Sequence, residues 1–259
     1  MPYRAPQDEE EWKDVSLTEW RFVGPGLCAY ITWLHFRMRL PIRKIREFLQ
    51  ESFGLSVSNG TIQKCFMETA RASDPVSQQI LACLLDEALM HVDETPHKEA
   101  GAPLWLWTFV TVSTVLFLIG RRTKTMWEKV GLWYAGWLMS DGYCVYRDHE
   151  KRLRCWAHLI RKAQGLADTL TPCIQGYGTQ ILKIINILID GIYQAREGPG
   201  GSIKIQFQGE LGRLKVLCEE MAKSDHKKTY ELGREFLNDW DAIFRVLDHP
   251  ALPLTNNVA

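Results

Sequence analysis

The feature that most constrains the fold is a change of hydrophobic period near Ala88. Before this residue the pattern is helical; after it, the three runs LMHVDE, LWLWTFV and TVLFLIG follow one another as expected strands. A helix is expected at 124–130, then a strand in GWLMSDGY, a strand in RLRCW and a helix in AHLIRKAQGLA. Three meander strands followed by alternating helices and strands predict a mixed α/β fold.

The apolar stretch Leu104–Gly120 invites a second interpretation, as a membrane span. It is shorter than the roughly 20 residues that a spanning helix needs, and Thr108, Thr111, Ser113 and Thr114 interrupt it. Its Val, Thr, Trp and Phe content is typical of strands, with TVST at the bend of a hairpin. We therefore expect no membrane partner.

The charges balance over the whole chain but not along it. With 31 Lys+Arg against 31 Asp+Glu, any binding to a polyanion would need local patches. Basic residues gather at 37–46 and 151–162, while Asp8–Glu11 is an acidic run; a solvated face is the alternative for each. Seven cysteines with no CxxC pair and no secretory signal indicate reduced thiols and a cytoplasmic location.

Two short helices are expected in the N-terminal part. Ile42, Ile45 and Leu49 fall on one face of the first, Gly54 can end it, and Ser58 can cap the second. This pattern predicts a helix-turn-helix, although a plain helical hairpin fits it equally well, and the nearby basic residues favour DNA binding. The residues that we expect to contact DNA are Arg43, Lys44, Asn59, Thr61, Gln63 and Lys64.

Asp93 and Asp141 each come at the end of an apolar, strand-like run. If the two strands are neighbours, both carboxylates could reach the same divalent metal ions. Carboxylates that hold two metal ions are used for in-line phosphoryl transfer. Aspartate at a strand end is also common in loops, so the spacing alone leaves both interpretations open.

Four segments, in order, resemble the IS66 family of insertion-sequence transposases. They are GPGLCAYITWLHFRMRLPIRKIREFL…SVSNGTIQKC, similar to that family's helix-turn-helix, then VDET (92–95), SDGY (140–143) and RCWAHLIRK (154–162). In addition, LNDWDAIFRVLDHPALPLTNNVA resembles the stretch that leads to the family's third catalytic acid. The resemblance covers about Gly24–Ala259. It implies an RNase H-like catalytic core with a DDE triad that cleaves and transfers DNA strands with Mg2+ or Mn2+.

By this resemblance, Asp93 and Asp141 are the first two catalytic carboxylates, and they hold the two metal ions expected in an intact enzyme. The third acid would be a Glu directly after Ala259. We therefore expect these 259 residues to bind the metal pair poorly and to be weakly active or inactive. Glu231 and Glu235 are less favoured substitutes, because they fall outside the matching motif.

Cys155 and His158 form a C-x-x-H pair that matches the family's CWAH motif. A zinc site would need two more ligands, and none stands at a suitable spacing. The pair is either a buried thiol beside a helix-start histidine or, with Arg161 and Lys162 one turn further, a contact to DNA phosphate or a brace for the active site.

The chain divides accordingly into an acidic tail (1–19), a helix-turn-helix region (20–73), an RNase H-like core (74–170), a helical insertion (171–250) and the start of the final catalytic segment (251–259), with a linker at Ser73–Pro75. Expected partners are element terminal repeats, target DNA, further copies of the chain and accessory proteins. A different class remains open: a non-catalytic remnant or regulator that binds element ends without cutting them.

Overall fold

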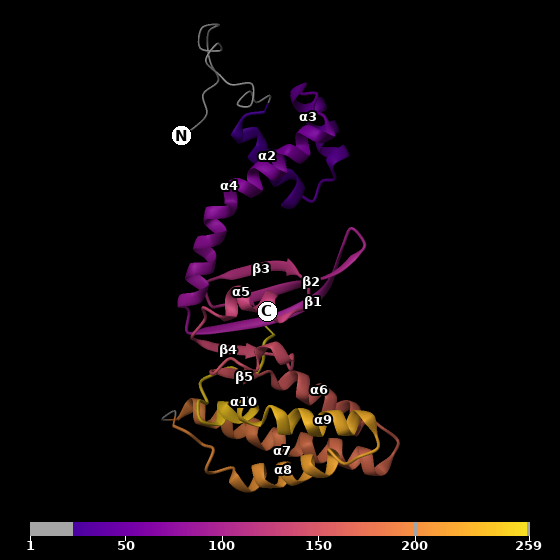
Figure 1. Cartoon of the computed structure of the whole chain (residues 1–259), viewed down its shortest axis with the longest axis vertical. Coiled ribbons are helices and arrows are strands. Elements are labelled where there is room, and N and C mark those ends of the chain that lie inside the picture. Colours follow the sequence, from indigo (N-terminus) through magenta and orange to yellow (C-terminus); the bar gives the residue numbers. More distant parts are fainter. Residues whose placement is uncertain (1–22, 199–200, 258–259) are drawn as a thin grey trace. The chain divides into compact units, whose positions relative to one another are not determined.

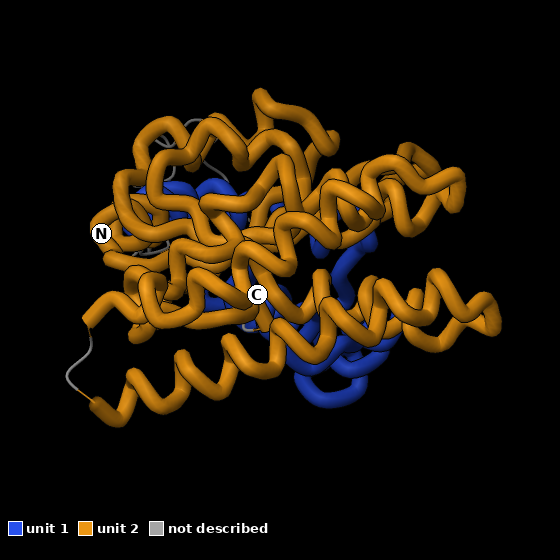
Figure 2. The backbone as a smooth tube through the Cα atoms, turned by 90° about the horizontal axis from the view of Figure 1, so that it is seen from below, with its two compact units in different colours: residues 1–79 blue, residues 80–259 orange. Residues whose placement is uncertain are grey.

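The computed structural model describes residues 23–198 and 201–257, and the chain forms two compact units, Met1–Gln79 and Ile80–Ala259 (Figure 2). The predicted acidic tail at 1–19 lies outside the described residues, as do the last two residues of the predicted final segment. None of the helices found in the described ranges combines the length and the apolar character needed to cross a membrane.

The first unit contains α2 (Pro25–Phe36), α3 (Ile42–Phe53) and the first part of α4 (Asn59–Asp86) (Figure 1). Its core is built from Ile31, Leu34, Ile45, Leu49 and Ile62.

The predicted ends of these helices are confirmed. Gly54 ends α3 with a left-handed φ of 68°, a conformation that costs glycine nothing. At the start of α4, the hydroxyl of Ser58 accepts the backbone N–H of Thr61 at 3.0 Å.

The predicted linker at Ser73–Pro75 is wrong, because α4 continues through Pro75 without a break. Proline removes one helical hydrogen bond and crowds the preceding turn, which usually ends or kinks a helix. Here Ile62 near the start of the helix and Leu84 near its end are both fully buried. Packing at both ends therefore outweighs the local cost of the proline.

The second unit holds a five-stranded mixed sheet with the order β3-β2-β1-β4-β5. Strands β1 (Leu89–Glu99), β2 (Ala102–Val110) and β3 (Val115–Gly120) form an antiparallel meander, while β4 (Trp137–Ser140) runs parallel to β1, and β5 (Arg152–Arg154) runs parallel to β4. The predicted mixed α/β fold is thus confirmed.

The turns of the meander follow from local chemistry. Ala100 and Gly101, with φ of 48° and 82°, join β1 to β2, as a tight hairpin requires. Thr111 donates its N–H to the carbonyl of Thr114 at 2.8 Å, which confirms the predicted bend between β2 and β3.

One face of the sheet is covered by aromatic side chains around α5 (Lys124–Gly131) and the short 3-10 helix η1 (Cys144–Tyr146). Trp107 and Phe109 from β2 stack in sequence with Trp127 from α5, and Tyr146 meets Trp127 edge to face. These rings bury Val92 of β1 and fix the strand that carries Asp93.

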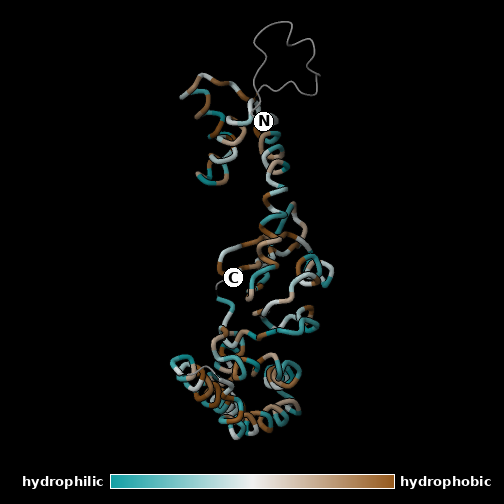
Figure 3. Tube along the Cα trace, turned by 90° about the vertical axis from the view of Figure 1, so that its left-hand side faces the viewer, coloured by the Kyte–Doolittle hydropathy of each residue, from teal (hydrophilic) through white to brown (hydrophobic). Residues whose placement is uncertain are grey.

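The rest of the second unit is helical, with α6 (Trp156–Ala167), α7 (Pro172–Glu197), α8 (Gln208–Met221), α9 (Lys227–Asn238), α10 (Trp240–Phe244) and η2 (Arg245–Leu247). Hydrophobic and hydrophilic positions alternate along these helices (Figure 3). Ile181, Ile185 and Ile192 of α7 join the buried core with Leu214 and Phe236. Although the helical pattern of the sequence continues from residue 228 to 247, α9 ends at Asn238, and the side chain of Asp239 pairs with the buried arginines of β5.

Candidate active site

The parallel pairing of β1 with β4 brings Asp93 and Asp141 to the same level of the sheet. In this pairing His91 of β1 lies opposite Met139 of β4. Because the strands are parallel, Asp93 and Asp141, each two residues further along the chain, reach the same level. Asp141 directly follows the end of β4 and accepts the backbone N–H of Tyr143 on Oδ1 at 2.8 Å. This side-chain-to-backbone bond fixes the turn after the strand.

The two carboxylates are close enough to influence each other. Burial raises the pKa of Asp93, and the negative charge of Asp141 raises it further, while the N–H of Glu94, His158 and Arg122 act in the opposite direction. Asp141 keeps 20% of its side chain exposed. The pair is therefore partly desolvated and carries a charge repulsion that a cation would relieve.

The neighbouring residue on β1, Glu94, belongs to the other face of the sheet. Its side chain is 1% exposed, accepts the hydroxyl of Tyr146 at 2.7 Å, and accepts Nη2 and Nε of Arg122 at 2.6 Å and 2.9 Å. Burial, followed by the charge of Asp141, raises the pKa of Glu94 to about 7. Two adjacent acids thus have separate surroundings because successive strand residues point to opposite faces.

Arg122 connects Glu94 to the aspartate pair. Its guanidinium lies 4.0 Å from the ring centre of Tyr143 and 4.6 Å from that of Trp105, and Nη2 lies 3.9 Å from Oδ2 of Asp141. The hydroxyl of Tyr143 in turn donates to the carbonyl of Arg122 at 2.8 Å. Stacked and hydrogen-bonded in this way, Arg122 places a positive charge beside Asp141 with little freedom to move.

Asp141 opens onto a cleft of about 550 Å3 in the second unit. Residues from the turn between β3 and α5, from the segment between β4 and β5, from α6 and from α9 line it: Arg122, Asp141, Gly142, Tyr143, Cys144, Arg147, His158, Lys162, Tyr230, Glu231, Arg234, Glu235 and Asn238. The candidate catalytic aspartate therefore faces a space that a substrate can enter.

A buried ion network holds α9 against β5 at one side of this cleft. Arg152 bonds both carboxylate oxygens of Asp239, at 2.9 Å and 3.2 Å, and Arg154 lies 3.1 Å from the same carboxylate. Arg154 also bonds Glu235, whose other oxygen accepts Nζ of Lys162 at 2.5 Å. Because Arg154 and Asp239 are almost fully buried, these charges depend on one another.

The chain also matches a known protein family. The model of the family described as "Transposase IS66 family" matches residues 21–259. The chain belongs to the IS66 transposase family. No curated protein matches it.

In this IS66-family transposase, the aspartate pair fits the donor set that Mg2+ prefers. Magnesium is commonly held by one or two carboxylates together with substrate phosphates and water, rather than by a complete protein cage. Within residues 23–198 and 201–257, no group of three or more His, Cys, Asp or Glu side chains is placed to hold a metal ion. Glu231 and Glu235 therefore do not complete a site with the aspartates, and Glu235 is already bonded to Arg154 and Lys162.

The two residues of the C-x-x-H pair lie on either side of the start of α6: Cys155 directly precedes the helix, and His158 lies in its first turn. Cys155 is fully buried, and its sulfur accepts the backbone N–H of Asn256 at 3.4 Å. His158 lies in the cleft, where its charge lowers the pKa of Asp93. Of the two predicted phosphate contacts that follow, Lys162 lines the cleft and Arg161 is exposed outside its lining.

The sequence did not single out three residues that contact the surroundings of the aspartates: Glu94, Arg122 and Asn256. Asn256 donates its side-chain amide to the carbonyl of Val92 at 3.3 Å, next to Asp93. Glu94 lies in the motif VDET and Asn256 in the segment TNN, so the family resemblance could have indicated both residues. Arg122 lies outside every quoted motif, and its role depends on contacts between distant segments.

In the first unit, most of the residues predicted to contact DNA have partners within the chain. Arg43 and Lys44 pair with Glu47 at 3.7 Å and 2.5 Å, and Lys64 lies 4.0 Å from Glu68. Thr61 is engaged in the Ser58 cap. Asn59 accepts a hydrogen bond on Oδ1 from Nη1 of Arg46 at 3.3 Å. Arg46 was not among the residues predicted to contact DNA. Gln63 is exposed.

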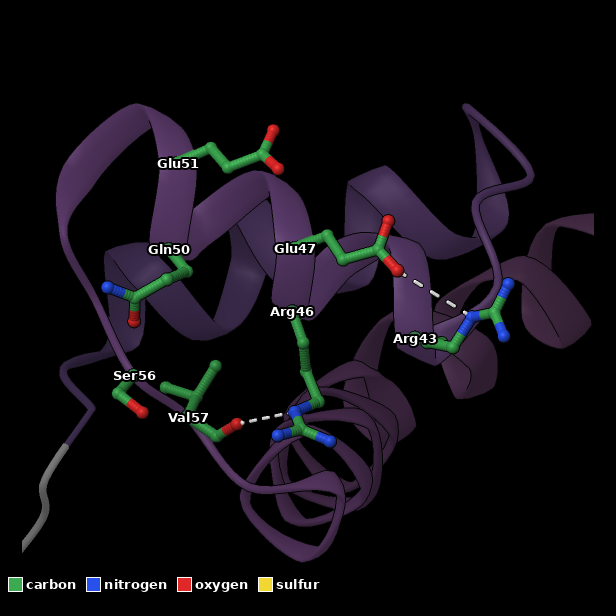
Figure 4. A pocket seen from close by; sticks show the side chains of 7 residues that line it. All are labelled: Arg43, Arg46, Glu47, Gln50, Glu51, Ser56 and Val57. Carbon is green, nitrogen blue, oxygen red and sulfur yellow. Dashed lines mark hydrogen bonds and ion pairs between the residues drawn. The ribbon is translucent and has the colours of Figure 1, made fainter.

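Figure 4 shows the cavity between α3 and the segment that follows it, about 380 Å3 in volume. Arg46 donates from Nε to the carbonyl of Val57 at 3.0 Å, which fixes the turn between α3 and α4. Glu47 and Glu51 line the same cavity and offset its basic residues. The exposed Gln63 lies outside this lining, whereas the exposed Arg43 is part of it.

Proposed function

We propose that this transposase cleaves and joins DNA strands by metal-dependent in-line phosphoryl transfer, with Asp93 and Asp141 as its first two catalytic carboxylates. The observation that carries the proposal is the β1–β4 register, which supports a shared site for the two carboxylates at one level of neighbouring strands. The strand order β3-β2-β1-β4-β5 supports the RNase H-like core that the family resemblance implies.

The chain's own residues have distinct tasks in this reaction. Asp93 and Asp141 would hold Mg2+ or Mn2+, which supplies a Lewis acid for the phosphate and lowers the pKa of an attacking water or 3′-hydroxyl. Arg122 holds the Asp141 side of the site and, with His158, offsets the negative charge of carboxylates and phosphate. Asn256 fixes the final segment beside Val92, at the residue before Asp93.

DNA recognition is assigned to two surfaces. The α3–turn–α4 segment would act as the helix-turn-helix, with Arg43, Lys44 and the exposed Gln63 directed to DNA. In the second unit, the cleft beside Asp141 would receive the strand to be cut. Transposition joins two element ends, so we also propose that several copies of the chain, with accessory proteins of the element, act together.

The direct test is nicking of supercoiled plasmid by the full chain, with Asp93→Asn and Asp141→Asn beside it. We expect only weak Mg2+-dependent nicking, which each substitution abolishes while binding to DNA is largely kept. Nicking that survives both substitutions would refute the assignment of these aspartates.

A second candidate function is binding to element ends without cutting them. It is favoured by one observation: among the described residues, no group of three or more His, Cys, Asp or Glu side chains could hold a metal ion. Tight, salt-dependent DNA binding by the wild-type chain with no nicking in Mg2+ or Mn2+ would support this candidate over the first.

A further inference from the structure

Three side chains of α9 form one flank that faces the cleft. Tyr230, Arg234 and Asn238 recur every four residues, so they lie above one another on the helix, and all three line the same space as Asp141. They are exposed, Tyr230 by 45%. We refer to these three residues as the α9 flank.

Arg234 of the flank adds an unpaired positive charge to the cleft. Three of the basic side chains in the lining are already engaged: Arg122 with Glu94, Arg147 with Asp239, and Lys162 with Glu235. Glu231 lies 3.9 Å from Lys227. Within the described part of the chain, Arg234 has no ion pair, so its guanidinium is free to bind an anion from outside.

The flank is also held rigidly. Asp239 directly follows α9 and Glu235 lies within it, and both are bonded to the buried arginines of β5. A helix fixed at these positions cannot easily turn its flank away from the cleft. A helix backbone that is pre-organised in this way adds little to the ordering cost when a ligand binds.

We propose that the α9 flank binds an unpaired stretch of DNA strand beside the bond that Asp93 and Asp141 act on. Arg234 contacts a backbone phosphate, and Tyr230 stacks on a base, the combination by which proteins hold single strands. Asn238 offers an amide to the same strand. Because the bases of a duplex stack on one another, this contact favours DNA with an unpaired tail. The inference rests on the proposed function and specifies how the same cleft holds its substrate.

The test compares two fluorescein-labelled DNA duplexes, one blunt and one with a single-stranded tail of mixed sequence, by fluorescence anisotropy in EDTA. We expect Tyr230→Ala and Arg234→Ala each to weaken binding to the tailed duplex by about tenfold, the effect of one lost stacking or phosphate contact. Binding to the blunt duplex should be unchanged. Tyr230→Phe keeps the ring and should keep the preference for the tailed duplex. Lys228→Ala is the matched control, because it removes an exposed charge of α9 outside the cleft lining.

Several results would overturn the proposal. Unchanged binding to the tailed duplex would do so, as would an equal loss on both duplexes, which would mark a general duplex-binding surface. A loss that accompanies a change in sedimentation would assign the flank to contact between copies of the chain. Because binding is measured without metal, none of these results depends on nicking, so a failure of the catalytic assignment can be told apart.

Discussion

The two basic runs of the chain, residues 37–46 and 151–162, have similar compositions in the sequence and opposite surroundings in the structure. In the first run, the side chains of Arg43 and Lys44 are 81% and 54% exposed. In the second, those of Arg152 and Arg154 are 4% and 0% exposed, and both are bonded to Asp239. Arg43 and Lys44 of the first run lie on the surface, whereas Arg152 and Arg154 of the second are buried in an ion network.

This difference shows that a run of positive charge does not by itself indicate a nucleic-acid contact. The carboxylates that neutralise the second run, Glu235 and Asp239, come about 80 residues later in the chain. Buried arginines of this kind stabilise an arrangement of helices and strands, here α9 against β5. Exposed arginines and lysines remain available to bind phosphate, because their ion pairs within the chain are weak and sensitive to salt.

The largest effect is expected for Asp239→Asn. This change keeps the shape of the side chain but leaves Arg152 and part of the charge of Arg154 buried without a counter-charge. Losing one partner of a buried ion pair costs about 3–5 kcal/mol, so the free energy of unfolding in urea should fall by that amount. Asp241→Asn, an exposed position two residues further, is the matched control and should change stability by less than about 0.5 kcal/mol. Equal effects of the two changes would show that the network is not the cause.

A much smaller effect on stability is expected for Arg43→Ala and Lys44→Ala. Both side chains are exposed, so each substitution should alter the free energy of unfolding by no more than about 0.5 kcal/mol. Each should nevertheless weaken DNA binding and lower the slope of log affinity against log salt by about 1, the loss of one phosphate contact. Lys215→Ala on α8 removes an exposed charge elsewhere. If that control lowered the slope as much, or if neither N-terminal substitution changed it, the contrast between the two runs would fail.

Local patterns were sufficient to predict most of the elements. The two-residue period of the strands located β1, β2 and β3. Gly54 indicated the end of α3, and Ser58 indicated the start of α4. Asp93 and Asp141 could be singled out because each ends an apolar run. These predictions depend on residues close together in the chain, where backbone geometry and side-chain period act directly.

What could not be predicted depends on contacts between distant residues. The break after Asn238 arises because Asp239 is drawn to Arg152, and the continuity of α4 through Pro75 depends on packing at its two ends. Arg122 reaches Glu94 only once the meander is formed. No periodic pattern carries this information, so the surroundings of the site had to come from the structure.

The most direct test of the central claim is iron-mediated cleavage of the polypeptide. With Fe2+ in place of Mg2+ and a mild reductant, hydroxyl radicals cut the backbone next to the bound ion, and the fragments are mapped by mass spectrometry. The account predicts cuts near Asp93 and near Asp141, suppressed by excess Mg2+ and absent in Asp93→Asn and Asp141→Asn. Cuts elsewhere, or cuts that persist in both variants, would contradict a shared metal site on β1 and β4.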